Sequence, residues 1–337
     1  MIITRTPFRV SFIGGGSDLR EFYSKKAGAV LSTTINKYMY ISTHPFFNRK
    51  AFQLKYSKTE LADSINEIQH PIIREVLNKF KIYGGVEISS NADIPAGTGL
   101  GSSSAFTVGL LHNLYTLQAK YVSKNRLAED ACEMEIDILK EPIGKQDQYA
   151  SAFGGINMIE FLQDGQVRVE LLAISSEDKI NLQKNLLMFY TKTQRSASAL
   201  LEKQKNSMSD RDKFELLGEM IPYVYKLRDA LSQKQFDYLG EVLHKGWCLK
   251  KKITNEISND SIDSYYEKAL EAGAIGGKLL GAGGGGFLLF YCPLKNQDKV
   301  RHALHGLFEL KFDFDYEGSK VIYFDEDSSG GAYGFFE

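Results

Sequence analysis

Residues 95–105 have a composition that suits phosphate binding. They read Pro-Ala-Gly-Thr-Gly-Leu-Gly-Ser-Ser-Ser-Ala and lie between an expected strand, 86–92, and an expected apolar helix, 105–120. The three glycines allow positive φ angles and let the backbone approach a ligand closely. The serines fall at the start of the helix, where free N–H groups and the helix dipole attract an anion. The segment therefore predicts an anion site, with a flexible loop and a serine N-cap as the alternative.

A carboxylate on the next expected helix, 124–140, is predicted to face the protein interior. The neighbours of Glu135 three and four positions away are all apolar. A buried carboxylate is costly unless it is paired or ligates a cation. A Mg²⁺ ion held jointly by Glu135 and the hydroxyl of Ser103 would meet that need, as a serine does in P-loops. The alternative is a boundary glutamate that reaches solvent or an internal arginine.

Asp147 follows a break in the chain at Pro142 and Gly144. An aspartate after such a break is commonly a helix cap. Phosphoryl transfer gives it another role, because the attacking hydroxyl needs a group that orients it and accepts its proton. We interpret Asp147 either as the cap of an expected helix, 146–153, or as the catalytic aspartate of a kinase.

Two charged residues flank the turn at residues 14–16, which is Gly-Gly-Gly. Arg9 could stabilise charge that develops on a transferring phosphoryl group. Asp18 could accept hydrogen bonds from the hydroxyl groups of a sugar. A surface arginine and a capping aspartate are the alternatives.

A second glycine-rich segment, 281–286, matches the pattern GxGxxG of dinucleotide-binding proteins. Such a pattern should follow a strand and begin a helix. Here an expected helix, 261–272, precedes the segment and an expected strand, 287–292, follows it. We therefore expect a tight loop that approaches a ligand from the second half of the chain, with Lys278 adding positive charge.

Charge and composition argue against several classes of protein. Lysine and arginine total 41 and aspartate and glutamate 42, so no basic excess points to nucleic acid or an anionic membrane. Three scattered cysteines, and histidines without ligand spacing, favour neither a disulfide framework nor a zinc site. No apolar run reaches the roughly 20 residues of a membrane span, and no signal peptide is recognised. We expect a cytoplasmic enzyme that is a monomer or a homodimer.

Periodicity and chain breakers predict the elements that position these residues. Strands are expected at 1–13, 29–43 and 51–56, the last two as a hairpin around 44–48. Further strands are expected at 156–162, 166–173 and 185–191, and further helices at 19–26, at 70–81, within 196–251 and at 296–307. A chain of 337 residues suits two domains, predicted as 1–180 and 181–337.

Three motifs resemble, in the same order, those of the GHMP kinases, the superfamily of galactokinase, homoserine kinase, mevalonate kinase and phosphomevalonate kinase. They are TPFRVSFIGGGSD at 6–18, the loop at 95–105, and residues 278–287. The resemblance implies a two-domain α+β fold, with a ribosomal-S5-like N-terminal domain, a ferredoxin-like C-terminal domain and an active site between them. It also implies ATP and Mg²⁺.

The resemblance assigns roles by position. Asp147 matches the catalytic aspartate and Arg9 the basic residue that assists it. Ser103 and Glu135 match the ligands of Mg²⁺. The residues expected to bind ATP are Pro95, Gly97, Thr98, Gly99, Leu100, Gly101, Ser102, Ser103 and Ser104. The residues expected to bind the substrate are Gly15, Gly16, Ser17, Asp18, Arg195, Lys250, Lys251, Gly283 and Gly284.

The turn at residues 14–18 guides the choice of substrate. Galactokinases carry GEHTD there, whereas GGGSD is similar to the branch that contains D-glycero-D-manno-heptose 7-phosphate kinases and L-fucokinases. Segments 190–195 and 247–251 also resemble the heptose kinases. A phosphorylated acceptor needs cations beyond those that serve ATP. The candidates are Arg195, Lys250 and Lys251, with ordinary surface charges as the alternative.

We therefore expect a kinase that phosphorylates the anomeric hydroxyl of D-glycero-D-manno-heptose 7-phosphate to give the 1,7-bisphosphate. Such a product would serve nucleotide-activated heptose or surface polysaccharide synthesis. Two alternatives remain open: a kinase for an unphosphorylated sugar such as L-fucose, galactose or an N-acetylhexosamine, and a non-catalytic sugar or nucleotide sensor. The joint presence of Asp147, Glu135 and Ser103 argues against the sensor.

Overall fold

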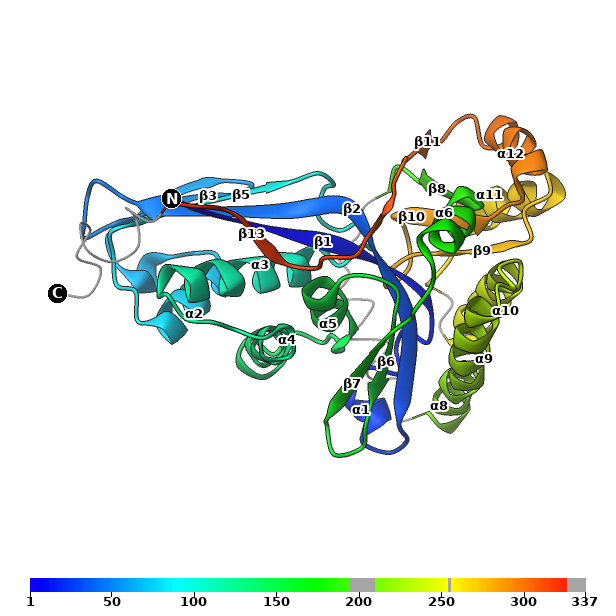
Figure 1. The fold of residues 1–337 in the computed structure, drawn as a ribbon, viewed down its shortest axis with the longest axis horizontal. Helices are drawn as coiled ribbons and strands as arrows, with labels where there is room; N and C mark the ends of the chain where they lie inside the picture. The colour runs from blue at the N-terminus through cyan, green and yellow to red at the C-terminus, as the bar shows by residue number, and fades with distance from the viewer. Residues whose placement is uncertain (194–209, 254–255, 326–337) are drawn as a thin grey trace.

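Two long strands form the centre of the larger of two sheets (Figure 1). The computed structural model describes residues 1–193, 210–253 and 256–325. β1 (Ile2–Ile13) and β2 (Gly28–Pro45) are antiparallel. β1 alternates between buried and half-buried side chains up to Arg5 and is fully buried from there on. Its later residues are buried on both faces because α3 (Ser102–Leu117) packs against Thr6 and α10 (Tyr238–Ile253) against Ile13.

The larger sheet has the order β13-β1-β2-β5-β3-β4; β6 and β12 also pair with β2, and β7 pairs with β6. Its shorter strands are β3 (Phe52–Lys55), β4 (Thr59–Ala62), β5 (Val86–Ala92), β6 (Asn157–Phe161), β7 (Val167–Leu171), β12 (Phe314–Asp315) and β13 (Lys320–Phe324). The predicted hairpin of 29–43 with 51–56 is wrong, because β5 lies between these strands and pairs with both. β5 forms seven residue pairs with β2, more than the four-residue β3 can supply.

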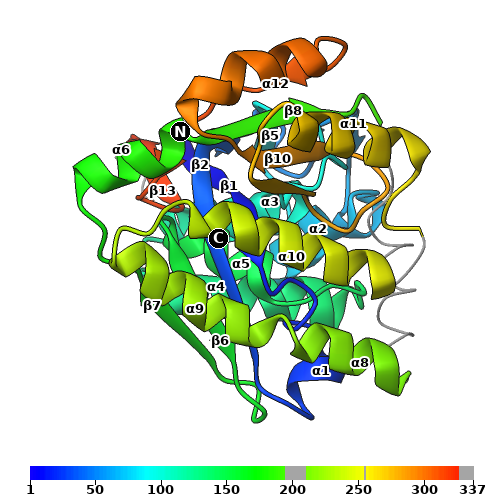
Figure 2. The same ribbon diagram turned by 90° about the vertical axis from the view of Figure 1, so that its right-hand side faces the viewer.

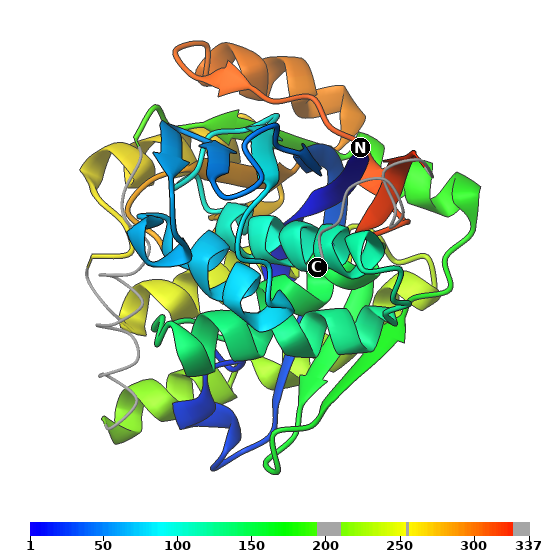
Figure 3. The same ribbon diagram turned by 90° about the vertical axis from the view of Figure 1, so that its left-hand side faces the viewer.

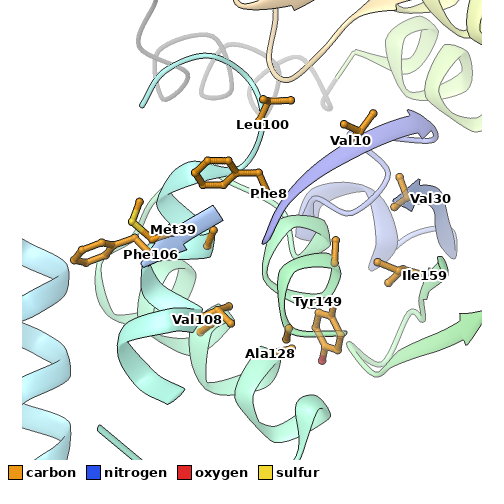
Figure 4. Packing of buried hydrophobic residues seen from close by; sticks show 14 of the residues in the cluster. Phe8, Val10, Val30, Met39, Leu100, Phe106, Val108, Ala128, Tyr149 and Ile159 are labelled. Carbon is orange, nitrogen blue, oxygen red and sulfur yellow. The ribbon is translucent and has the colours of Figure 1, made fainter. Parts of the chain in front are cut away.

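A layer of helices covers one face of this sheet (Figures 1 and 3). They are α2 (Pro71–Phe80), α3, α4 (Lys124–Cys132), which continues into a π-helical segment at Glu133–Ile138, and α5 (Gln146–Phe153). Figure 4 shows the core, where Phe8 of β1, Val108 of α3 and Tyr149 of α5 belong to one cluster. The first helix, α1, is a single turn (Arg20–Tyr23), shorter than predicted, because the chain turns to begin β2 at Gly28.

The smaller sheet has the order β11-β8-β10-β9. Its strands are β8 (Leu186–Tyr190), β9 (Gly276–Leu279), β10 (Phe287–Tyr291) and β11 (Phe308–Glu309). The helices that the structure describes after residue 175 are α6 (Ser176–Lys184), α8 (Arg211–Gly218), α9 (Ile221–Ser232), α10, α11 (Asp260–Glu271) and α12 (Gln297–Ala303). A 3₁₀ turn precedes α2 at Ile65–Glu67, and another precedes α12 at Leu294–Asn296. α9 and α10 lie side by side (Figure 2). Within the described residues, no helix is long and apolar enough to span a membrane.

β9 was not predicted from the sequence. Two of its four residues are glycine, which has low strand propensity. Both glycines are required by packing. A Cβ at Gly276 would overlap the carbonyl of Gly240, and one at Gly277 would overlap the ring of Phe290.

After the second half, the chain returns to the larger sheet, where β13 pairs with β1. The hydroxyl of Ser319 lies 2.9 Å from Oγ1 of Thr6 and 3.0 Å from Nδ1 of His112, so it ties the returning segment to β1 and α3. The larger sheet therefore takes its strands from residues 2–171 and 314–324, and the smaller sheet from 186–309. A domain boundary at residues 180/181 stays a prediction.

The ring of His112 makes this contact sensitive to acid. Burial, together with the charge of Lys124, lowers its pKa from 6.5 to about 4. Between these two values the unfolded chain binds a proton that the folded chain does not, so stability falls as the pH drops through this window. The complete loss corresponds to about 3 kcal/mol of unfolding free energy. We expect His112→Gln to remove this acid-dependent loss of unfolding free energy, as measured by urea unfolding at pH 7 and pH 4.5.

The matched control is His305→Gln, at an exposed ring. This control should keep the full acid dependence of the wild-type protein. Equal acid sensitivity in His112→Gln and the wild type would contradict the assignment.

Candidate active site

A cavity of about 750 Å³ lies between the two halves of the chain. The N-terminal half supplies β1, the turn that follows it, the loop before α3, and the segment 141–147. The C-terminal half supplies Lys250 of α10, Lys278 of β9, and Gly281 and Ala282 of the loop between β9 and β10. Segments that are far apart in sequence therefore form the wall of one cavity.

The loop at 95–101 has the conformation that its glycines predict. Gly97, Gly99 and Gly101 have φ angles of +76°, +85° and +75°, which residues with a Cβ rarely adopt. α3 begins directly after the loop, and its N-cap is Gly101 rather than a serine. A glycine cap has no side chain to bind the first N–H groups of the helix, so these groups can bind an anion.

The residues expected to bind ATP fall into two groups. Those in the cavity wall are Gly97, Gly99, Gly101, Ser102, Ser103 and Ser104. Pro95, Thr98 and Leu100 instead shape the loop. Oγ1 of Thr98 donates to the carbonyl of Pro95 at 3.0 Å. Leu100 is 1% exposed in the core, and its carbonyl accepts the N–H of Arg9 at 3.1 Å.

The loop at 281–286 packs directly on the loop at 95–101, the predicted phosphate loop. A Cβ at Gly281 would overlap Gly99, and a Cβ at Gly286 would overlap the carbonyl of Thr98. The segment connects β9 to β10 and begins no helix, so the GxGxxG match is not a dinucleotide-binding motif. Its glycines allow the backbone of the second half to contact the backbone of the first.

Ser17, Gly283 and Gly284 were predicted to bind substrate but lie outside the cavity wall. Gly283 packs against the backbone of Ile257, and the N–H of Gly284 donates to the carbonyl of Ile257 at 2.8 Å. Ser17 is fully buried, and its hydroxyl donates to the carbonyl of Gly14 at 2.8 Å. These residues hold the shape of their turns. Gly15, Gly16 and Asp18 do reach the cavity.

The side chains predicted to bind the phosphate of the acceptor also differ in position. Lys250 lines the cavity, whereas Lys251 pairs with Asp263 at 3.1 Å outside the cavity wall. Arg195 lies outside the described residues. Helical spacing could have chosen between the two lysines, because Lys250 follows Trp247 by three positions and shares its buried face.

Glu135 faces inward, as its helical neighbours predict. Its side chain accepts hydrogen bonds from the hydroxyl of Ser103 at 3.1 Å and from Nε2 of Gln148 at 2.6 Å. Only 1% of the residue is exposed. Burial raises its pKa to about 7, although hydrogen bonds from Ser104, Gln148 and others oppose the shift. A nearby cation would favour the ionised form of such a carboxylate.

Mg²⁺ fits these two groups. Ser103 and Glu135 present hard oxygen donors, and both line the cavity. Mg²⁺ in phosphoryl-transfer sites binds one or two protein oxygens and completes its shell with water and phosphate oxygens. The pair therefore suits a Mg²⁺ ion that arrives with a nucleotide.

Asp147 and Arg9 form a two-pronged ion pair. Nε and Nη2 of Arg9 donate to the two carboxylate oxygens of Asp147, each at 2.7 Å. Nη1 of Arg9 donates to the carbonyl of Gly99 at 2.5 Å, which joins this pair to the phosphate loop. Asp147 is not the cap of α5, because Lys145 occupies that position. The carboxylate is therefore fixed in direction and open to the cavity.

Asp18 lies beside this pair. Its carboxylate accepts the N–H of Gly16 at 2.8 Å and the N–H of Gln146, the first residue of α5, at 3.1 Å. Burial and the neighbouring charge of Asp147 raise the pKa of Asp18. Gly144 is required here because a Cβ would overlap the carboxylate of Asp18.

An aromatic region of the lining was not predicted from the sequence. The rings of His70 and Phe106 stack with centroids 5.0 Å apart, and Tyr56 meets His70 edge-on at 4.8 Å. All three line the cavity. They come from separate segments, and Phe106 was expected only as part of the apolar helix at 105–120. No local pattern joins such residues.

Two family models match the chain. The model of the GHMP kinases N terminal domain matches residues 66–155, and that of the GHMP kinases C terminal domain matches residues 227–310. A D-glycero-alpha-D-manno-heptose 7-phosphate kinase of Campylobacter jejuni is 28% identical in an alignment 316 residues long that covers 89% of this chain and 92% of the relative. A galactokinase of Pyrococcus furiosus is 26% identical and covers 89% of this chain and 90% of its own length.

Solved structures share the fold. A crystal structure of a D-glycero-D-manno-heptose 1-phosphate kinase from Bacteroides thetaiotaomicron has a TM-score of 0.75 and 25% sequence identity. The match covers 96% of this chain and 100% of that one. The chain therefore belongs to the GHMP kinases, has their two-domain α+β fold, and is a phosphotransferase with an alcohol group as acceptor.

Proposed function

We propose that this kinase transfers the γ-phosphate of ATP to the anomeric hydroxyl of a sugar phosphate in the cytoplasm. The acceptor that we propose is D-glycero-D-manno-heptose 7-phosphate, which gives the 1,7-bisphosphate. The observation that carries the proposal is Asp147, which Arg9 holds in the same cavity as the phosphate loop. A proton acceptor and a phosphate-binding loop are the two parts that phosphoryl transfer to an alcohol requires.

ATP would lie along the cavity with its phosphates over the loop at 97–104. The N–H groups at the start of α3 attract the phosphate oxygens. The base would then reach the rings of Tyr56, His70 and Phe106, which offer flat apolar surfaces for stacking. When bound at Ser103 and Glu135, Mg²⁺ would offset negative charge on the phosphates.

Asp147 orients the acceptor hydroxyl and receives its proton as the new P–O bond forms and ADP leaves. Arg9 keeps the carboxylate aimed at the cavity and adds positive charge near the transferring group. Because Arg9 also binds the carbonyl of Gly99, the proton acceptor and the phosphate loop keep a fixed separation. Such positioning supplies a large part of catalysis in reactions of this type.

The acceptor is inferred from two observations. The Campylobacter jejuni relative is named as a heptose 7-phosphate kinase and aligns with most of this chain. Asp18, Gly15 and Gly16 of the GGGSD turn line the cavity beside Asp147, where they can bind sugar hydroxyls. The galactokinase relative favours a second candidate, an unphosphorylated sugar.

A screen of ADP release separates these candidates. The purified protein is assayed with Mg²⁺ and ATP against heptose 7-phosphate, L-fucose, galactose and N-acetylhexosamines. We expect heptose 7-phosphate to give the highest kcat/KM. A higher value with an unphosphorylated sugar would reassign the acceptor. Sugar binding without ADP release from any acceptor would contradict the kinase proposal.

Phe106→Leu tests the place of the base. Leucine keeps the site apolar but removes the ring that stacks on His70. Loss of one aromatic contact should raise KM for ATP about fivefold with little change in kcat. The KM for the acceptor is the internal control, because the acceptor would bind at the Asp18 end. An unchanged KM for ATP would place the base elsewhere.

A further inference from the structure

Two buried lysines of the second half face the cavity. Lys250 of α10 is 9% exposed and Lys278 of β9 is 7% exposed. Both line the wall opposite the N-terminal half. Nζ of Lys250 donates to the carbonyl of Gly281 at 2.5 Å, and Nζ of Lys278 donates to the carbonyl of Phe12 at 3.2 Å. The two ammonium groups therefore lie between the loop that packs on the phosphate loop and the strand that leads to the GGGSD turn.

Within the part of the chain that the structure describes, neither ammonium has a carboxylate partner in direct contact. Among residues 1–193, 210–253 and 256–325, no carboxylate oxygen lies within 4 Å of either group, and Asp147 is paired with Arg9 instead. Asp18 and Asp147 favour the charged form of Lys250 through longer-range attraction, and the positive charge of Arg9 opposes this effect. Burial lowers the pKa of both lysines, to about 8 for Lys250. Each ammonium has three N–H donors and uses one on a carbonyl.

Such a pair is costly in the empty protein. Burying a charge without a partner is unfavourable, and two like charges in one cavity repel each other. Apolar side chains of the same length would fill the space at lower cost. Arg9 adds to the repulsion, because its positive charge also lowers the pKa of both lysines. A dianion that enters the cavity would satisfy both ammonium groups.

We propose that Lys250 and Lys278 together bind a phosphate dianion inside the cavity, apart from the backbone N–H groups of the loop at 97–104. The inference rests on the proposed function for the class of ligand. Two sources carry that chemistry: the phosphate of the acceptor and the γ-phosphate of the nucleotide. The lysines come from the second half and the phosphate loop from the first, so phosphate held between them also draws the two halves together.

The test uses the full chain with Lys250→Met and Lys278→Met. Methionine keeps the length of the side chain and removes its charge. The matched control is Lys252→Met, an exposed lysine on the same helix as Lys250. Without ligand, each buried variant should melt at least as high as the wild type, because an uncompensated buried charge is gone. The control should match the wild type in melting and in binding.

Two titrations distinguish the sources of phosphate. In the first, inorganic phosphate is titrated calorimetrically into protein saturated with Mg²⁺ and a non-hydrolysable ATP analogue, which occupies the phosphate loop. A tenfold or greater loss of phosphate affinity in both buried variants supports the site and assigns it to the acceptor. In the second, affinities for the ATP analogue and for ADP are compared. A tenfold or greater selective loss for the ATP analogue supports the site and assigns it to the γ-phosphate.

Wild-type affinity of both buried variants in both titrations would overturn the proposal. So would a lower melting point with intact binding, because the lysines would then be structural. If Lys278→Met fails to fold, Lys250→Met carries the same test from a different element. Neither titration needs a sugar or turnover. If no acceptor is phosphorylated in the screen but phosphate binding depends on the lysines, the proposed function alone is rejected. If an acceptor is phosphorylated but phosphate binding does not depend on the lysines, this inference alone is rejected.

Discussion

Replacing Asp147 by asparagine is expected to lower kcat about 10³-fold, the scale of a lost general base. Asparagine has the same shape and can still accept one hydrogen bond from Arg9, but it cannot take the proton of the attacking hydroxyl. Both oxygens of Asp147 bind Arg9 in the native protein, so the side chain should stay in place. The measurement is initial ADP release at saturating ATP, with the acceptor identified by the screen.

The control for this variant is Asp164→Asn. Asp164 lies in the turn between β6 and β7, where its carboxylate accepts the N–H of Gln166 at 2.9 Å, and it is absent from the cavity wall. We expect wild-type kcat from the control and similar urea midpoints for all three proteins. A near-normal kcat in Asp147→Asn would show that another group accepts the proton.

Gly281→Ala is expected to lower kcat/KM about 10²-fold, because a displacement of about 1 Å at a reacting centre has an effect of this size. The added Cβ would overlap Gly99 at the tip of the phosphate loop. Gly281 also has a φ of +77°, which alanine adopts only with strain. The loop and the second half must therefore move apart, and Arg9 moves with the loop because it binds the carbonyl of Gly99.

Gly306→Ala is the matched control. A Cβ at Gly306 would meet no atom within 4 Å, so the same chemical change should leave activity and melting temperature unaltered. We expect Gly281→Ala to lose activity at temperatures where circular dichroism shows it folded, with a melting temperature lowered by several degrees. Wild-type kinetics in Gly281→Ala would show that contact between the two glycine loops does not position the phosphate loop.

Local chemistry explains why much of the candidate site was predictable. The phosphate loop depends on glycines that adopt positive φ and on the start of a helix, and both features lie within residues 95–105. The inward direction of Glu135 follows from helical periodicity over one turn on either side. The strand and helix at 86–92 and 146–153 were predicted to the residue. Each of these depends on neighbours within a few positions.

Features that depend on distant partners were mispredicted or missed. β2 pairs with β5, which begins some 40 residues after β2 ends, and not with the nearer strand β3. β9 was not expected as a strand because two of its four residues are glycine. Its glycines are needed because a Cβ there would overlap Gly240 or Phe290. The stacked rings of Tyr56, His70 and Phe106 come from separate segments that no sequence pattern connects.

The sequence by itself determined the groups available for chemistry: a predicted anion-binding loop, an inward carboxylate, an aspartate after a chain break and an arginine before a glycine turn. Only the tertiary structure decided how these groups work together. It paired Arg9 with Asp147, turned Lys250 into the cavity and Lys251 away from it, and placed the loop at 281–286 on the phosphate loop. The physical reason is range. Backbone conformation and helix periodicity act over a few residues, whereas charge pairing and close backbone packing depend on segments that only folding brings together.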